Sequence, residues 1–463
     1  MKNTRVLSLL LILIVTACAS APPKPALETR PFLKFPDGFL WGTATAAYQV
    51  EGGIRNNWSA AGIDAKQAVH HYDLYEQDFD QAQKLGTNAY RMSIEWARIE
   101  PEPGKFDHEV IAHYRDMLKA LHRRGIEPMV TLFHFTTPIW FEAKGGFEKS
   151  ENIADFIDFV RFVSRELKDD VSWWNTLNEP LVYAFKGFDE GSWPPFRHDR
   201  NQALRVVRNL IIAHGKAYRT IHRQDPIAWV GYAHNNTLLQ PNWPANPMDQ
   251  AMTSLQSYLF NESFWNAIAT GHMDFSAPSL DPVKIPYDPD LQGAMDYIGI
   301  NYYTRYMVNA TGKTLTLPGV PVSDLNWEIY PEGILYVLRM ARPHAEALNI
   351  PIIITENGLA DAQDKQRSRY LIDHLTYLHQ AIQEGIPVKG YFHWSLMDNF
   401  EWAEGFHAQF GLMDRDRQWR KSAYLYQHIT QQNGFPAQWL EQLPELEIPA
   451  AEINSQTGTE PAL

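Results

Sequence analysis

The sequence contains one cysteine, Cys18, in 463 residues, so no disulfide bond can form within the chain. Basic residues are also scarce: 41 Lys and Arg stand against 54 Asp and Glu, and the net charge of −13 argues against a nucleic-acid-binding surface. The pair His70-His71 has no third group at metal-ligand spacing. Phosphate loops and a Ser nucleophile elbow are missing from the sequence as well. We therefore expect neither a metal nor a cofactor, and no motif indicates a protein partner.

The N-terminal residues have the order of a secretory leader. Lys2 and Arg5 precede an apolar segment from Val6 to Val15 that is too short to cross a bilayer comfortably. The tetrapeptide Val15-Thr16-Ala17-Cys18 resembles the lipobox of bacterial lipoproteins. We predict a signal peptide over residues 1–17 and lipidation at Cys18. The protein would then be an exported, membrane-anchored lipoprotein, on the outer-membrane or periplasmic side; an ordinary signal peptide or an uncleaved anchor is the alternative.

The rest of the composition is that of a globular enzyme. Apolar residues make up 45% of the chain, enough for a large core, and the 15 Trp and 21 Tyr provide aromatic faces that suit sugar rings. We predict a Pro-rich linker over residues 18–34 and a single catalytic domain over residues 35–432. Residues 433–463 are expected to form a C-terminal tail that is partly disordered.

Apolar, strand-like runs alternate with amphipathic helical stretches through this domain, which is the pattern of a parallel sheet. Eight such runs predict an α/β fold, the (β/α)8 TIM barrel. A doubly wound open sheet is the competing fold, but no Gly-x-Gly-x-x-Gly turn follows the first run. The runs are 39–48, 89–99, 128–135, 171–177, 228–234, 297–303, 351–355 and 388–396, and helices are expected at 73–84, 108–124 behind the cap Asp107, 152–168, 201–223, 332–347 and 364–384.

Two of the predicted strands end in a glutamate beside an asparagine. The run through Trp173 stops at Asn178-Glu179-Pro180, where proline forbids the next ladder bond, and the run from Pro351 stops at Glu356-Asn357-Gly358, where the glycine would turn the chain away. An ionised carboxylate at the end of a buried strand is costly unless it is paired or used. Glu179 and Glu356 are therefore our candidate catalytic pair, although a lone glutamate there could simply begin a solvated loop.

Other strand ends also carry side chains capable of chemistry. In a (β/α)8 barrel these ends meet at one face, where catalytic groups gather. Taken singly, each has a structural explanation: His134 could be a core histidine, Arg91 an ion-pair partner and Trp394 a packing residue. Their shared position is the argument for function. The candidates are Gln49, Arg91, His134, Asn178, Asn301, Tyr303 and Trp394.

Several motifs resemble those of glycoside hydrolase family 1, the retaining β-glucosidases and their relatives, from about Phe35 to Tyr426. The resemblance implies a β-glycoside or oligosaccharide substrate, with Glu179 as acid/base and Glu356 as nucleophile. It also implies that Arg91, Asn301 and Tyr303 surround the nucleophile. Sugar-holding roles are implied for Gln49, His134, Asn178, Glu401 and Trp402, a sugar floor for Trp394, the aglycone side for Trp327 and the sugar rim for Phe410. The motifs are Phe39-Leu40-Trp41-Gly42, Gln49-Val50-Glu51-Gly52, Thr176-Leu177-Asn178-Glu179-Pro180, Asn301-Tyr302-Tyr303, Ile354-Thr355-Glu356-Asn357-Gly358 and His393-Trp394-Ser395-Leu396-Met397-Asp398-Asn399-Phe400-Glu401-Trp402.

Glu401 bears on the type of sugar. The 6-phospho-glycosidases of the family have a small residue at this position and a nearby lysine, whereas residues 400–411 of this chain keep Glu401 and contain no Lys or Arg. Treated as a fixed anion, Glu401 would repel a phosphate. The expected terminal sugar is therefore neutral.

The sequence also departs from the family pattern. The usual His-Trp-Asp-Leu-Pro is His134-Phe135-Thr136-Thr137-Pro138 here, and Leu181 stands where a tryptophan often follows Asn-Glu-Pro. These changes affect the expected aglycone rather than the chemistry. The segment from Ser93 to Arg98 is similar to archaeal glycosidases and to plant galactolipid-remodelling members, so a transglycosidase acting on sugar or lipid acceptors is the main alternative. An inactive glycan-binding lipoprotein is the other, but such proteins typically lose one carboxylate.

Overall fold

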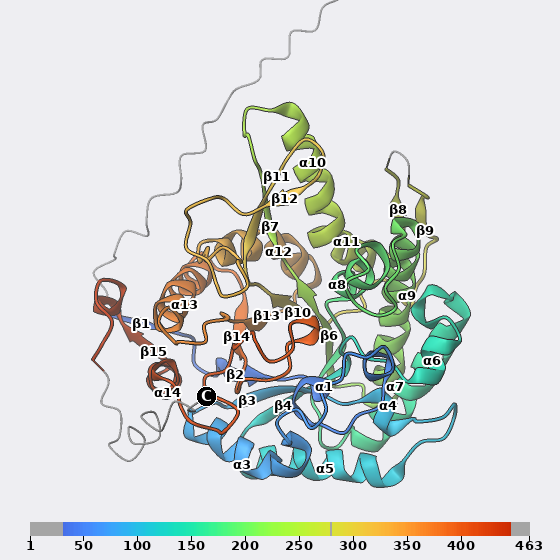
Figure 1. Ribbon diagram of the computed structural model, residues 1–463, viewed down its shortest axis with the longest axis horizontal. Helices are drawn as coiled ribbons and strands as arrows, with labels where there is room; N and C mark the ends of the chain where they lie inside the picture. The colour runs from blue at the N-terminus through green and yellow to red at the C-terminus, as the bar shows by residue number, and fades with distance from the viewer. Residues whose placement is uncertain (1–30, 278–279, 446–463) are drawn as a thin grey trace, which may run out of the picture.

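The computed structural model describes residues 31–277 and 280–445, so the predicted leader, Cys18 and most of the predicted linker lie outside the described residues. Within them, parallel strands close into a barrel with the order β10-β13-β14-β2-β3-β4-β5-β6 (Figure 1). All eight predicted runs supply one strand each, in the predicted chain order, and the (β/α)8 fold is confirmed. The strands are β2 Leu40–Ala44, β3 Ala89–Ser93, β4 Glu127–Phe133, β5 Trp173–Asn178, β6 Trp229–Asn235, β10 Ile298–Asn301, β13 Ile352–Asn357 and β14 Val388–Trp394.

Long helices pack around the barrel, and every helix expected from the sequence is present. Asp107 caps α5 as predicted, because its carboxylate accepts the backbone N–H groups of Glu109 (2.9 Å) and Val110 (3.1 Å). The long helices are α3 His71–Lys84, α5 His108–Arg123, α7 Ile153–Leu167, α9 Arg200–Gln224, α12 Gly333–Leu348, α13 Arg367–Gln383 and α14 Lys421–Gln432. Shorter ones are α1 Ala47–Val50, α2 Asn57–Ala60, α4 Trp96–Ile99, α6 Ile139–Ala143, α8 Pro180–Ala184, α10 Pro247–Ser257 and α11 Ser263–Thr270.

Two of the predicted strands are too long. The run at 39–48 divides into β2 and α1, and the run at 89–99 divides into β3 and α4. In both cases the strand is followed by one buried helical turn of similar apolar composition. A continuous apolar run has no period, so its sequence cannot mark the point where the strand ends.

The folded domain extends beyond the predicted limits of 35 and 432. Strand β1 (Phe32–Lys34), placed in the linker by the sequence analysis, pairs antiparallel with β15 (Gly434–Pro436), which was placed in the tail. Trp439, a little further on, is buried. Strands of three residues leave no local pattern when their partner lies about 400 residues away, so neither can be predicted from the sequence.

A projection rises from the catalytic face of the barrel (Figure 1). It consists of α10 and a small sheet of β7 (Leu238–Pro241), β11 (Arg305–Val308) and β12 (Thr314–Leu315), in the order β12-β11-β7. A separate hairpin pairs β8 (Met273–Phe275) with β9 (Val283–Ile285). The sequence patterns predict neither addition. Within residues 31–277 and 280–445, no helix has both the length and the apolar character needed to cross a bilayer.

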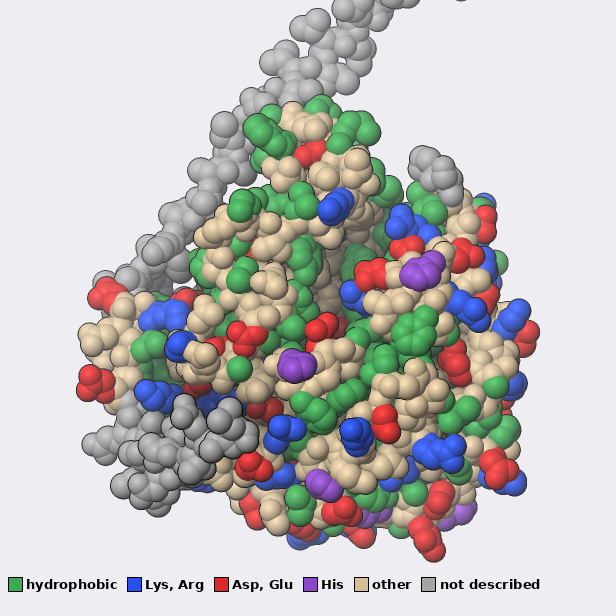
Figure 2. Space-filling view, viewed as in Figure 1, with side chains coloured by type: hydrophobic (Ala, Val, Ile, Leu, Met, Phe, Trp, Pro, Cys, Tyr) green, Lys and Arg blue, Asp and Glu red, His purple; other side chains and the backbone are tan. Residues whose placement is uncertain are grey.

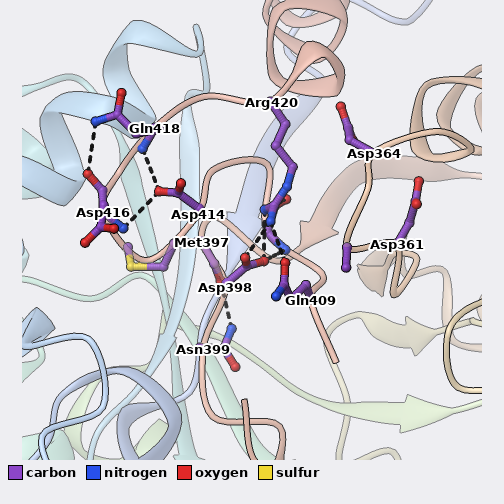
Figure 3. A network of polar contacts seen from close by, with 12 residues as sticks. Asp361, Asp364, Met397, Asp398, Asn399, Gln409, Asp414, Asp416, Gln418 and Arg420 are labelled. Atoms are coloured by element: carbon purple, nitrogen blue, oxygen red, sulfur yellow. Dashed lines mark hydrogen bonds and ion pairs between the residues drawn. The ribbon is translucent and has the colours of Figure 1, made fainter. Parts of the chain in front are cut away.

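The loop after β14, which carries Glu401, is held by a buried ion pair. Arg420 donates two hydrogen bonds to the carboxylate of Asp398, at 2.9 and 2.6 Å, and a third to the side chain of Gln409 at 2.8 Å (Figure 3). Asp398 also accepts the backbone N–H of Gly411 at 2.9 Å. The two ends of the loop are therefore fastened to each other and to the start of α14.

Replacing Arg420 tests this bracing. The side chains of Arg420 and Asp398 are only 11% and 7% exposed, so Arg420→Met should lower the free energy of unfolding by about 3 to 5 kcal/mol by leaving a buried carboxylate unpaired. Arg339 is the matched control: its bond to Glu384 has the same length, 2.6 Å, but its side chain is 40% exposed. Arg339→Met should cost less than about 1 kcal/mol. Urea unfolding of both variants measures this, and equal losses would contradict the expectation.

Candidate active site

Glu179 and Glu356 lie at the carboxyl ends of their strands, as predicted. Glu356 is the last residue but one of β13, and Glu179 directly follows the end of β5. Both are buried: Glu356 is 3% exposed and Glu179 is 7% exposed. Glu179 has a left-handed backbone (φ 42°, ψ 58°), which a non-glycine residue rarely adopts, and Pro180 then begins α8. This turn takes the chain sharply out of the strand and leaves the Glu179 side chain among the strand ends.

Both oxygens of the Glu356 carboxylate accept hydrogen bonds. Arg91, on β3, pairs with Oε1, and the hydroxyl of Tyr303 donates to Oε2 at 2.6 Å. Arg91 is itself fixed, because its Nη2 donates to Asn178 Oδ1 at 2.6 Å and its Nε to Thr131 Oγ1 at 3.3 Å. A charge-assisted bond and a phenol bond thus set the direction of the Glu356 carboxylate.

Glu179 is held by neutral donors instead. Asn301 donates to its Oε1 at 2.8 Å, and Asn235 donates to the same oxygen at 3.0 Å. Burial, reinforced by the charge of Glu356, raises the pKa of Glu179 to about 7. The raised pKa keeps a protonated form of Glu179 available near neutral pH, so it can act as an acid.

Asn235 was not among the sequence candidates. It is the last residue of β6, so its position follows the rule that selected the others, but the predicted run stopped one residue earlier, at His234. Its orientation is fixed by Thr237, whose hydroxyl donates to Asn235 Oδ1 at 3.0 Å. A strand boundary placed one residue further along would have found it.

Three buried polar atoms beside the carboxylates have no hydrogen-bond partner among the described residues. They are Gln49 Oε1, His134 Nδ1 and Asn178 Nδ2. Each such atom costs about 1 to 3 kcal/mol if it stays unsatisfied, and native proteins contain few of them. Three together point to a ligand rich in hydroxyl groups.

Glu401 is hydrogen-bonded to Gln49, one of these three residues. Gln49 Nε2 donates to Glu401 Oε2 at 3.1 Å, to Asn399 Oδ1 at 3.0 Å and to the Phe400 carbonyl at 2.8 Å. Burial raises the pKa of Glu401 to about 8, with the bond from Gln49 opposing the shift and the charges of Glu356 and Glu179 adding to it. Burial therefore favours the protonated form of Glu401, and the fixed anion assumed from the sequence is not supported.

Aromatic rings line the site in two clusters. His134 stacks on Trp402, with ring centroids 5.8 Å apart, and lies 6.1 Å from Trp394. On the other side Tyr303 is 5.7 Å from Trp327 and 6.1 Å from Phe410. Apart from Cys18, which is outside the described residues, every site residue predicted from the sequence belongs to one of two contacting sets, and the charges of Glu179 and Glu356 in one set act on Glu401 in the other. Across residues 31–277 and 280–445, no set of three His, Cys, Asp or Glu side chains is arranged to hold a metal ion.

Comparisons with known proteins all lead to one family. The sequence profile of Glycosyl hydrolase family 1 matches residues 33–435. Beta-glucosidase A of Thermotoga maritima is 34% identical, over 87% of this chain and 98% of its own length. The beta-galactosidase of Sulfolobus acidocaldarius is 30% identical, over 87% of this chain and 96% of its own.

Solved structures agree with the sequence match. A beta-glycosidase from Pyrococcus horikoshii superposes with a TM-score of 0.81 at 36% identity, covering 90% of this chain and all of that one. A Thermotoga maritima family 1 glycoside hydrolase, complexed with a cyclophellitol analogue that mimics the transition state, gives 0.80 at 30% identity, with 88% and 100% covered. This chain therefore belongs to glycosyl hydrolase family 1, the family that its motifs resemble, and is a retaining β-glycosidase.

Proposed function

We propose that Glu356 is the nucleophile and Glu179 the acid/base in hydrolysis of a terminal, non-reducing β-linked neutral sugar. The observation that carries this assignment is the difference between their surroundings. Glu356 receives bonds from a cation and a phenol, whereas Glu179 receives bonds only from amides and has its pKa raised to about 7. Two identical side chains are thereby prepared for opposite roles.

The reaction follows from these positions. A Glu356 oxygen attacks the anomeric carbon, the glycosidic C–O bond breaks, and Glu179 gives its proton to the departing oxygen. Glu179, now ionised, takes a proton from water, and the resulting hydroxide displaces Glu356 from the anomeric carbon. Two displacements restore the original β configuration. Loss of the Glu356 charge in the covalent intermediate removes one of the influences that raise the pKa of Glu179, which suits its change from acid to base.

The nucleophile assignment predicts where a mechanism-based reagent attaches. An activated 2-fluoro-β-glucoside should form a stable ester with Glu356, because the fluorine slows the second displacement. Peptide mass spectrometry of the inactivated enzyme identifies the modified residue. Glu356→Ala should neither turn over substrate nor accept the label. A label on another carboxylate would contradict the assignment.

The acid assignment predicts the alkaline side of the pH profile. Because Glu179 must be protonated to assist departure, kcat/KM should fall about tenfold per pH unit once the pH exceeds the pKa of about 7. In Glu179→Gln, a dinitrophenyl glycoside needs no acid assistance, so its rate of enzyme glycosylation should lose that alkaline fall. Rates of the native enzyme on an unactivated phenyl glucoside test the fall, and stopped-flow measurement of dinitrophenol release by the variant tests its loss. If the fall persists in the variant, another group is the acid.

We attribute the preference for a neutral sugar to missing positive charge rather than to a fixed negative one. Burial favours the protonated form of Glu401, so its repulsion of a phosphate is weaker than the sequence suggests. A phosphate beside Glu401 would still lose its hydration shell on entering the buried site. Residues 400–411 contain no Lys or Arg that could pair with its charge. The hydroxyls of a neutral sugar instead match the unsatisfied atoms of Gln49, His134 and Asn178.

This proposal predicts substrate discrimination. The kcat/KM for nitrophenyl β-glucoside should exceed that for its 6-phosphate by about a hundredfold or more, the expected penalty for a buried and unpaired charge. Parallel assays of nitrophenyl β-galactoside show which neutral sugar fits better, since relatives named for both activities match the chain. A preference for the phosphorylated compound would reverse the assignment of Glu401 to the sugar site.

We also propose that Cys18 carries a lipid anchor, supported by the lipobox-like Val15-Thr16-Ala17-Cys18 and the prolines that follow it. In a Gram-negative host, the native protein should incorporate labelled palmitate and sediment with membranes. Cys18→Ser should prevent labelling and leave the precursor uncleaved or the enzyme in the soluble fraction. A native protein that stays unlabelled would disprove the anchor.

A further inference from the structure

The projection on the catalytic face begins at the active site itself. Strand β7 starts shortly after Asn235, which binds Glu179, and β11 starts shortly after Tyr303, which binds Glu356. The two strands pair in parallel, from Leu238 opposite Arg305 to Pro241 opposite Val308. Asn242 continues this register, because its N–H donates to the Val308 carbonyl at 2.8 Å. The outer end of the projection is thus rigidly connected to the mouth of the site.

That outer end is apolar, and we call residues 243–248 the apolar tip. Trp243 is 68% exposed and Met248 57% exposed. Pro244, Ala245 and Pro247 are exposed as well. Figure 2 shows hydrophobic side chains gathered at the top of the molecule, where the projection ends. Adjoining exposed apolar residues of this kind mark interaction surfaces in soluble proteins.

The tip is a fixed turn rather than a loose loop. Asp249, which is buried, accepts the backbone N–H of Trp243 at 2.8 Å and the side-chain amide of Asn246 at 2.9 Å. Asn246 in turn caps α10 by accepting the N–H of Met248 at 3.0 Å, and its own N–H donates to the Trp243 carbonyl at 2.8 Å. These bonds fix the backbone on both sides of the exposed side chains. Internal bonding therefore fixes the backbone that carries the exposed side chains of Trp243 and Met248.

Charge around the tip identifies the kind of surface it fits. From Thr237 to Asn261 the only charged residue in the sequence is Asp249, and its carboxylate is turned inward. The neighbouring turn between β11 and β12 exposes Lys313, and Gln256 of α10 holds that turn by donating to the Gly312 carbonyl at 2.6 Å. An exposed Trp with apolar neighbours, one cation and no exposed acid is the composition found at a membrane–water interface.

We propose that the apolar tip inserts into the interfacial layer of an anionic phospholipid bilayer and holds the catalytic face toward that surface. The choice of a bilayer over a second copy of the chain rests partly on the proposed anchor at Cys18. Thirteen residues separate Cys18 from Phe32 at the start of β1, and at about 3.1 Å per residue such a segment can span about 40 Å at most. An anchored domain therefore stays close to lipid, where even a weak contact is occupied.

Vesicle sedimentation tests the tip without the anchor. The mature chain, residues 18–463 with Cys18→Ser, carries no acyl group, so any binding to vesicles of phosphatidylethanolamine and phosphatidylglycerol comes from the protein surface. We expect this parent to sediment with the vesicles. Combining Trp243→Ser with Met248→Ser should lower the partition coefficient about tenfold or more. Lys313→Gln should weaken binding to these vesicles but leave binding to pure phosphatidylcholine unchanged.

Ile227 supplies the matched control. It is 87% exposed but precedes β6, at the end of the barrel opposite the catalytic face, so Ile227→Ser should not change the partition coefficient. All variants should hydrolyse nitrophenyl β-glucoside in solution like the parent, which shows that they are folded. A parent that stays in the supernatant, or equal losses from Ile227→Ser and the tip variant, would overturn the proposal. So would a parent dimer that the tip substitutions dissociate in analytical ultracentrifugation, because the tip would then cover a second copy. No acyl chain is present, so failure here is distinct from failure of the anchor.

Discussion

Two acidic groups buried side by side must differ in protonation if they are to work together, and most of the catalytic face serves to maintain that difference. Arg91 has a central part, because it touches Glu356 with one nitrogen and Asn178 with another. Asn301 continues the connection, donating to Asn178 and to Glu179. The carboxyl groups are thus joined through a short series of polar residues, in which a cation lies at one end and amides at the other. Position within that series sets the role of each.

A site of this kind requires strand ends that do not move, and the barrel provides them by closing on itself and by fastening its loops. The ion pair of Asp398 and Arg420 does this for the segment after β14. Arg367, which is fully buried, does it for the segment after β13, donating to the carbonyls of Asp361 (2.7 Å) and Gln409 (2.9 Å). Charged side chains behind the site thereby hold in place the neutral and aromatic ones that face the sugar.

The sequence was enough to place the eight strands and both glutamates, because buried strands produce apolar runs and strand ends are where polar residues interrupt them. What it could not supply depended on contacts between distant segments. Asn235 was missed through a boundary error of one residue, and β1 pairs with β15 from the far end of the chain. The protonation of Glu401 depends on burial, which no local motif reports. Gly358 was expected to turn the chain, yet its backbone is ordinary: a Cβ there would lie 1.8 Å from the Trp394 carbonyl oxygen, so close packing requires the glycine.

The pairing of β1 with β15 means that the polypeptide enters and leaves the domain at one place. Neighbouring entry and exit points make a chain easy to cut and rejoin elsewhere, since a short peptide can link the old ends. A circularly permuted version of this barrel could therefore be opened in a helix connection on the face opposite the glutamates. Such a chain would keep every strand end of the catalytic face in its present order, and the domain could be inserted into a host protein through that single point of attachment.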